Sequence, residues 1–263
     1  MKDMKDLKRL RDQLEMCDEL ILDTLRMRYR IVENITAYKQ EHGIKIVHLD
    51  EDERKLNHAK ARIGDDDYAL SILKVYNYIR YRSKKIQGKN LFGFNIFLIG
   101  FMGAGKSTIS STLRKVFAMN VVEMDQIIAE KNGMSISEIF STYGEEYFRN
   151  EETQLLIDIQ EKKNVIISCG GGVPMREVNV EEMKKSGKII LLTASPKTIL
   201  GRVKDDHSRP LLENNKNEKF IGDLMEKRRK AYEGAADIII NTDGKNAVEI
   251  CEEIIAKASE MKD

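Results

Sequence analysis

The sequence has few of the residues that build disulfide or zinc frameworks. Only three of the 263 residues are cysteines, and Cys17, Cys169 and Cys251 lie far apart with no CxxC spacing. This scarcity argues against both kinds of framework and fits a protein of the reducing cytoplasm.

A long hydrophobic run is also missing. The most apolar stretch, residues 91–105, is interrupted by Asn95 and four glycines, so it is too short and broken to span a bilayer. The first 13 residues contain no apolar segment like that of a secretory signal. We therefore expect no membrane partner.

Neither charge sign is in large excess. The chain has 44 Lys and Arg against 43 Asp and Glu, a formal net charge of +1. Residues 1–93 hold 20 basic and 16 acidic residues, and residues 94–263 hold 24 and 27. Neither part has the basic field of a nucleic-acid binder, so we expect no nucleic-acid partner.

Proline and glycine are scarce before residue 90. All three prolines lie beyond it, and only Gly43, Gly64 and Gly88 precede it. This pattern predicts three helices, each ended by a glycine, over residues 5–41, 51–63 and 66–87. Residues 1–90 are therefore predicted to form an all-α three-helix domain.

The first predicted helix has an apolar stripe with steps of mostly three and four residues. A helix of this length measures about 55 Å, and a small domain cannot bury it alone, so the pattern suggests pairing with another chain. Arg28 interrupts the stripe, and a charge there needs a partner or a ligand. The stripe consists of Leu7, Leu10, Leu14, Cys17, Ile21, Leu25, Val32, Ile35 and Tyr38.

Beyond residue 93 the pattern changes to short apolar runs separated by amphipathic stretches. Such alternation predicts an α/β fold with a parallel sheet. We assign residues 91–263 to this domain, with five strands. The strands are expected at residues 95–100, 121–125, 165–169, 188–193 and 237–241.

A phosphate-binding motif follows the first of these strands and opens a helix. Residues 100–107 fit GxxxxGK[ST], a loop whose backbone N–H groups face phosphates. Lys106 is expected to reach the β- and γ-phosphates, and Ser107 to ligate Mg²⁺. The motif predicts binding of a nucleoside triphosphate and identifies no acceptor.

Residues for an acceptor site come from other strand ends. Glu123 and Asp125 end the second strand, where an acidic pair could organise Mg²⁺ and orient a hydroxyl. Gly170, Gly171 and Gly172 follow the third strand and permit close approach of a ligand. Three arginines suit carboxylate or phosphate groups: Arg149, Arg209 and Arg228.

Together these motifs resemble shikimate kinase over residues 94–258. The resemblance implies ATP as phosphoryl donor, Mg²⁺ on Ser107 and Glu123, and Asp125 as the residue that binds shikimate and accepts its proton. Glu123 replaces the aspartate usual in that family. The resemblance further implies ATP contacts from Gly103, Ala104, Gly105, Lys106, Ser107, Thr108 and Arg202; shikimate contacts from Arg149, Gly171, Gly172 and Arg228; and a lid over 203–220 carrying the catalytic Arg209. The alternative is another small P-loop kinase with a different polyol acceptor.

The helical part also carries polar residues with a shared orientation. Lys39 lies 11 residues after Arg28, so both face the same side of the first helix. Ser83 and Gln87 share a face of the third. Arg11 lies some 25 Å from Arg28 along the helix and could join that site only from a second chain.

This arrangement resembles the all-helical chorismate mutase family over residues 4–88. The resemblance implies an intertwined homodimer, in which Arg11 and Arg28 clamp the carboxylates of chorismate while Lys39 and Gln87 bind its ether oxygen. Asp52 and Ser83 complete the implied site. Glu51 departs from the family, which usually has arginine there. The alternative is a non-catalytic module that dimerises the kinase or senses chorismate or prephenate.

Overall fold

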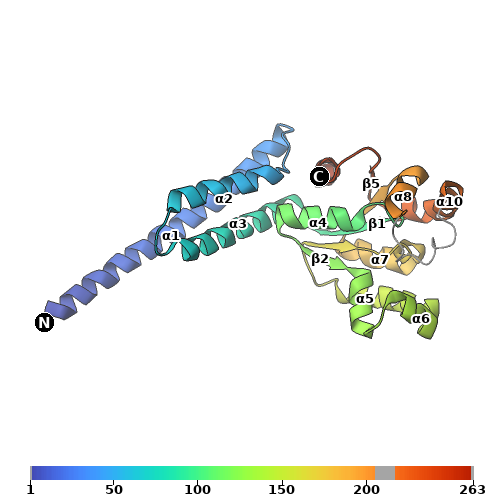
Figure 1. Ribbon diagram of the computed structural model, residues 1–263, viewed down its shortest axis with the longest axis horizontal. Helices are drawn as coiled ribbons and strands as arrows, with labels where there is room; N and C mark the ends of the chain where they lie inside the picture. Colours follow the sequence, from blue (N-terminus) through green and yellow to red (C-terminus); the bar gives the residue numbers. More distant parts are fainter. Residues whose placement is uncertain (1, 205–216, 262–263) are drawn as a thin grey trace.

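The computed structural model describes residues 2–204 and 217–261. Figure 1 shows an extended helical part followed by an α/β part, as the sequence predicts. Among the described residues, no helix combines the length and the apolarity that a membrane crossing requires.

The helical part consists of α1 (Lys2–Glu41), α2 (Leu49–Ile63) and α3 (Ala69–Leu91). Helix α3 packs against both α1 and α2. The N-terminal half of α1 extends past both of them (Figure 1), and every side chain from residue 5 to residue 24 is exposed. Within this chain, seven of the nine residues of the predicted apolar stripe are exposed, and only Leu25 and Val32 are partly buried.

Two of the three predicted helix stops are correct, and the third is wrong. Gly43 and Gly64 follow α1 and α2, whereas Gly88 lies inside α3. A Cβ at Gly88 would come 2.9 Å from the Cβ of Phe117. This glycine therefore lets α3 approach α4 of the α/β part closely, and the helix continues to Leu91.

The α/β part contains one five-stranded parallel sheet in the order β2-β3-β1-β4-β5, which confirms the predicted fold class. The strands are β1 (Asn95–Gly100), β2 (Asn120–Glu123), β3 (Val165–Ser168), β4 (Gly187–Thr193) and β5 (Ile238–Asn241). The helices are α4 (Lys106–Phe117), α5 (Met124–Asn132), α6 (Ile136–Asp158), α7 (Glu177–Ser186), α8 (Pro196–Val203), α10 (Glu218–Ala235) and α11 (Ala247–Glu260), with a 3₁₀ turn η1 (Val173–Met175).

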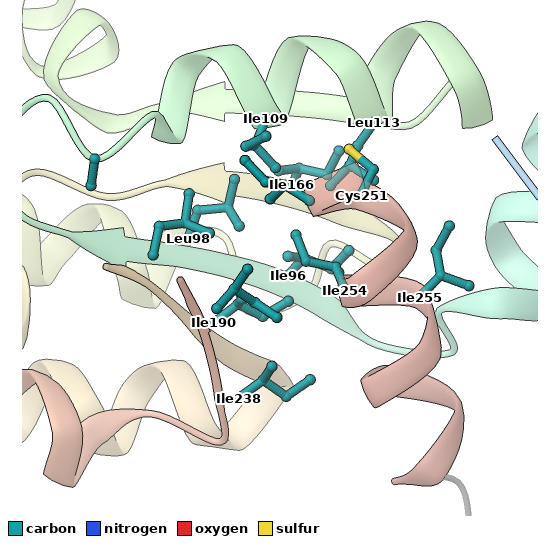
Figure 2. Packing of buried hydrophobic residues seen from close by; sticks show 14 of the residues in the cluster. Ile96, Leu98, Ile109, Leu113, Ile166, Ile190, Ile238, Cys251, Ile254 and Ile255 are labelled. Atoms are coloured by element: carbon teal, nitrogen blue, oxygen red, sulfur yellow. The ribbon is translucent and has the colours of Figure 1, made fainter. Parts of the chain in front are cut away.

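Both faces of the sheet are buried, as the continuous apolar strands require. Strand β1 sends Ile96 and Leu98 to one face, where they pack beneath α4 and α11 (Figure 2). It sends Phe97 and Ile99 to the opposite face, toward side chains of α6, α7 and α10. The sheet is therefore a rigid platform whose strand ends can hold a site.

The two parts share a hydrophobic core. Leu91 and Phe92, at the end of α3, are almost fully buried and belong to the cluster beneath α4 and α11. Ile46 and Val47, between α1 and α2, join the same cluster, and the Val47 N–H donates to Glu252 of α11. The helical part is therefore packed directly on the α/β part, without a free linker.

Candidate active sites

A cavity of about 1300 Å³ opens at the carboxyl ends of β1, β2 and β3. Ligands of open parallel sheets bind at this edge. The predicted kinase residues that line it are Gly103, Ala104, Gly105, Lys106, Ser107, Thr108, Glu123, Asp125, Arg149, Gly171, Arg202 and Arg228. The phosphate-binding loop and the predicted acceptor residues therefore line the same cavity.

The phosphate-binding loop joins β1 to α4. Lys106 begins α4, and its Nζ donates to the carbonyl oxygens of Gly100 at 2.8 Å and Phe101 at 3.3 Å. Glu123 Oε1 accepts a 2.8 Å hydrogen bond from Ser110 Oγ, one turn further along α4. The Ser107 hydroxyl and the Glu123 carboxylate thus line the same cavity, and oxygen ligands of this kind suit Mg²⁺.

One prediction about the acidic pair needs correction. Asp125 does not continue the strand, because β2 ends at Glu123 and α5 begins at Met124. Met124 is fully buried, which anchors the first turn of α5 beneath the sheet edge. The prediction that Glu123 and Asp125 both end the second strand is therefore wrong for Asp125, although both side chains line the cavity.

The glycine loop after β3 makes room for two carboxylates. A Cβ at Gly170 would lie 2.7 Å from Asp125 Oδ1 and 2.7 Å from Glu152 Oε1. A Cβ at Gly172 would overlap the guanidinium of Arg149. Side chains here would displace the charged groups, so the glycines are required by close approach rather than by flexibility.

Arg149 on α6 is held by two carboxylates of the same helix. It donates from Nη2 to Glu145 Oε1 and from Nη1 to Glu152 Oε2, each at 2.8 Å. Glu152 is fully buried, and burial raises its pKa to about 7 despite the nearby guanidinium. Its Oε1 has no hydrogen-bond partner. A carboxylate poised in this way orients Arg149 toward the cavity.

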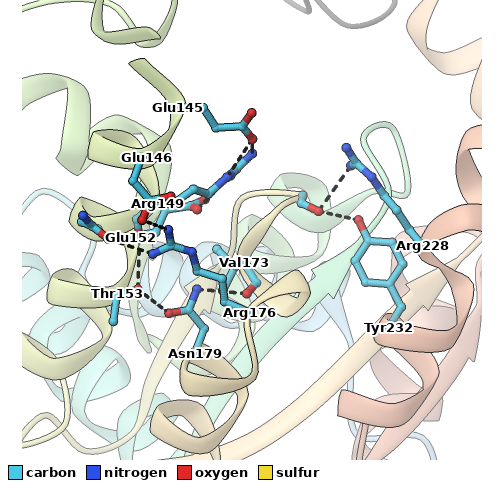
Figure 3. A network of polar contacts seen from close by, with 12 residues as sticks. Glu145, Glu146, Arg149, Glu152, Thr153, Val173, Arg176, Asn179, Arg228 and Tyr232 are labelled. Carbon is cyan, nitrogen blue, oxygen red and sulfur yellow. Dashed lines mark hydrogen bonds and ion pairs between the residues drawn. The ribbon is translucent and has the colours of Figure 1, made fainter. Parts of the chain in front are cut away.

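Arg228 on α10 approaches the glycine loop from the other side (Figure 3). The hydroxyl of Tyr232 donates to the Gly171 carbonyl at 2.6 Å, and Arg228 Nη1 lies 3.4 Å from the same oxygen. The Arg228 guanidinium also lies over the ring of Phe101. Arg149 and Arg228 thus flank one loop, an arrangement that suits a carboxylate.

Arg202 on α8 lines the cavity next to the phosphate-binding loop. Its Nη1 donates to the carbonyls of Gly103 and Ala104 at 3.2 and 3.3 Å, and to Thr242 Oγ1 at 3.0 Å. Arg209, predicted to act from a lid, lies outside the described residues, as does most of that lid.

In the helical part, α1 and α3 bring three of the predicted residues into hydrogen-bonded contact. Arg28 donates from Nη1 to the hydroxyl of Ser83, and Gln87 Nε2 donates to Thr36 Oγ1 at 3.1 Å. Lys39 is partly buried on the same side of α1, and this burial lowers its pKa. Arg28 thus has a polar partner for its charge in the stripe.

The predicted residues of α2 make ion pairs of their own. Asp52 is bound by Arg80, with Nη2 to Oδ1 at 3.0 Å, and by Lys84 of α3. Glu51 accepts two hydrogen bonds from Arg54, at 3.0 and 2.7 Å, which hold its pKa at about 2. The charge reversal at Glu51 is therefore offset by an adjacent guanidinium.

The structure leaves one predicted residue apart and adds others. Arg11 is exposed in the N-terminal half of α1, about 25 Å along the helix from Arg28. Sequence reasoning assigned no role to Glu152, Tyr232 or Thr36. The i,i+3 spacing of Arg149 and Glu152 could have revealed their ion pair, because such residues are neighbours on a helix.

The fold and the cavity define a P-loop kinase joined to a helical part. Residues 102–259 match the family model of shikimate kinase, and residues 10–88 match that of chorismate mutase type II. The chain belongs to the shikimate kinase family and carries a chorismate mutase type II region at its N-terminal side.

Individual relatives agree with this placement. The chain is 42% identical to the shikimate kinase of Thermodesulfovibrio yellowstonii over 161 residues, which covers 61% of this chain and 92% of the relative. It is 40% identical to that of Persephonella marina, covering 62% and 98%. A shikimate kinase structure from Acinetobacter baumannii in complex with shikimate matches with a TM-score of 0.62 and 30% identity, covering 66% of this chain and 98% of that one.

Proposed function

We propose that this chain phosphorylates the 3-hydroxyl of shikimate with ATP and, through its helical part, rearranges chorismate to prephenate. The kinase proposal rests above all on Arg149 and Arg228, which flank the glycine loop beside the phosphate-binding loop. Arg149 is already paired with Glu145 and Glu152, whereas Arg228 has no carboxylate partner among the described residues. A polyol acceptor without a carboxylate would leave the Arg228 guanidinium without an anionic partner.

In the kinase reaction, Arg149 and Arg228 bind the carboxylate of shikimate and fix the ring. Asp125 then accepts the proton of the 3-hydroxyl as its oxygen bonds to the γ-phosphorus of ATP, and ADP leaves with the electrons of the broken bond. Lys106 stabilises the charge on the phosphate oxygens, with Arg209 as a second cation. Catalysis therefore consists of positioning and electrostatic stabilisation.

Ser107 and Glu123 are the residues proposed to hold Mg²⁺. When bound, the ion would neutralise charge on the nucleotide phosphates. The hydrogen bond from Ser110 to Glu123 fixes that carboxylate, so the longer side chain at this position is oriented by α4.

In the helical site, the proposed reaction needs no nucleophile. Arg28 would bind a carboxylate of chorismate, and Lys39 and Gln87 would stabilise negative charge on the ether oxygen as its bond to the ring breaks. Ser83 holds Arg28 in place, and Asp52 remains a proposed contact. Catalysis would come from conformational restriction and charge stabilisation.

The proposed assembly is a homodimer through the N-terminal helices. Leu7, Leu10 and Leu14 are 48%, 57% and 63% exposed, and apolar side chains of this size are normally covered. A second α1 would cover them and bring Arg11 toward the partner's Arg28. Because the three cysteines are free, we also propose a cytoplasmic location.

Two assays on one full-length protein test both activities. Lys106→Ala is expected to reduce shikimate phosphorylation by at least about 100-fold and leave the loss of chorismate absorbance unchanged. Arg28→Ala is expected to do the reverse. If the unaltered protein phosphorylates shikimate but never consumes chorismate, the helical part is a dimerisation or sensing module instead.

A further inference from the structure

A second cavity lies between the helical part and the kinase part. It shares no lining residue with the kinase cavity, and it adjoins the helical candidate site, because its Arg80 and Lys84 pair with Asp52. It has a volume of about 320 Å³ and is formed by α3, by the C-terminal end of α4 and by the first residue of β2. Pockets for small ligands begin near this size. Lys115 lies nine residues after Lys106 on α4, which places this cavity about 14 Å along the helix from the phosphate-binding loop.

Basic side chains dominate the lining. Arg80 and Lys84 come from α3, and Arg114 and Lys115 come from α4. Among the residues that the structure describes, no carboxylate lines the cavity. Asn77 and Asn120 add amide groups that can donate to an anion.

The positive charge is only partly neutralised within the chain. Asp52 pairs with both Arg80 and Lys84, so one carboxylate serves two cations. Arg114 and Lys115 have no carboxylate partner among the described residues. The C-terminus of α4 contributes about half a negative charge, which offsets only part of the remainder.

Arg80, which lines the cavity, has a nitrogen without a hydrogen-bond partner. Its side chain is only 12% exposed, and its Nη1 and Nη2 are bound by Asn77 and Asp52. Its Nε is buried and has no hydrogen-bond partner. A buried donor without an acceptor costs free energy, so Arg80 has an unsatisfied N–H beside this cavity.

We propose that this cavity binds a small molecule with doubly negative oxygen groups, either a dicarboxylate or a phosphate. The ligand would bridge α3 and α4 and so connect the helical part to the helix that begins at the phosphate-binding loop. Arginine forks and lysine ammonium groups both suit such oxygens.

Calorimetric titration of the full-length protein with malonate, and separately with inorganic phosphate, tests this site. Both titrations use protein that carries Lys106→Ala and Arg28→Ala, so that the principal cation of each candidate substrate site is removed. We expect saturable binding of at least one probe near one equivalent, weakening with added salt. The tighter probe identifies the ligand as carboxylate or phosphate.

Substitutions at exposed positions then locate the binding. Arg114→Ala with Lys115→Ala is expected to raise the dissociation constant of the tighter probe at least tenfold. Lys184→Ala with Lys197→Ala removes the same charge from other exposed positions and should leave it within twofold. The swap Arg114→Lys with Lys115→Arg keeps the charge and should retain binding. The proposal is wrong if neither probe binds saturably, or if the alanine pair and its control behave alike.

Discussion

The kinase part and the helical part bury their apolar residues to very different degrees. Both faces of the five-stranded sheet are covered by helices of the same chain. In contrast, α2 has no fully buried residue, and every residue from 5 to 24 of α1 is exposed. The sheet of the kinase part is therefore covered within one chain, whereas the helical part leaves much of its apolar surface exposed.

The two candidate sites differ in the same way. In the kinase part, both arginines that would bind the acceptor and the phosphate-binding lysine line one cavity. In the helical part, hydrogen bonds between α1 and α3 hold Arg28, Ser83 and Gln87, while Arg11 lies far from them along α1. A site that draws on a neighbouring chain depends on assembly, so its activity should be far more sensitive to surface substitutions on α1.

The strongest test of this contrast places charges on the uncovered stripe. Leu10→Glu with Leu14→Glu is expected to dissociate the dimer and to reduce chorismate turnover at least about 100-fold, because burying two carboxylates is prohibitive. Shikimate phosphorylation should persist. Light scattering after size exclusion measures the mass, and Gln13→Glu is the control, since it adds charge on α1 without removing an apolar side chain. A wild-type monomer that turns over chorismate would contradict the model.

A second prediction separates the two substrates within the kinase cavity. Arg149→Ala should raise the KM for shikimate about 10- to 100-fold and leave the KM for ATP within twofold, because the lost guanidinium would contact only the acceptor. Steady-state kinetics measures both constants. Arg229→Ala, an exposed arginine paired with Glu226, should change neither. Equal increases for both substrates would show that Arg149 supports the fold of the cavity instead.

A third prediction concerns the buried carboxylate beside Arg149. The pKa of Glu152 is raised to about 7, so the folded state binds a proton more tightly than the unfolded chain. Stability should therefore fall as pH rises from about 4.5 to about 7, by up to roughly 1.4 kcal/mol per pH unit. We would measure the free energy of unfolding by urea at several pH values across this range. Its dependence on pH should be weaker in Glu152→Gln than in the wild type. The same dependence of unfolding free energy on pH in both proteins would mean that the pKa of Glu152 is not raised.

Sequence patterns predicted the architecture well where it depends on the spacing of residues close together in the chain. The five strands and the phosphate-binding loop follow from apolar runs and a fixed spacing, both of which are local properties. The continuation of α3 through Gly88 could not be predicted, because its cause is the contact with Phe117, distant in sequence. Likewise, the α5 start at Met124 depends on burial against the sheet, which strand alternation does not reveal.

The candidate sites show the same limit. Separate motifs predicted that Arg149, Asp125 and the glycine loop belong together, and their placement around one cavity agrees. Their assignment to shikimate stays a prediction. The burial of Glu152 has no local signature, since glutamate on a helix is usually exposed. The ion pairs of Asp52 with Arg80 and Lys84 also join helices that the sequence could not align in space.

The smallest predicted effect concerns the charge reversal on α2. Glu51 and Lys55 both lie close enough to Lys39 to influence its pKa, so an unneutralised Glu51 would repel a dicarboxylate bound there. Arg54 neutralises most of this charge through its two hydrogen bonds to Glu51, while Lys55 lies further from the same carboxylate, at 3.4 Å. Arg54→Ala should therefore raise the KM for chorismate about three- to tenfold, while shikimate kinetics stay unchanged.

The double variant Glu51→Gln with Arg54→Ala separates the two roles of that arginine. If Arg54 acts only by neutralising Glu51, the double variant should recover the wild-type KM, because no charge remains to be neutralised. If the double variant stays as impaired as Arg54→Ala, the guanidinium contacts the substrate and replaces the arginine usual at position 51. Arg62→Ala, on the same helix and exposed, should have no effect on either activity.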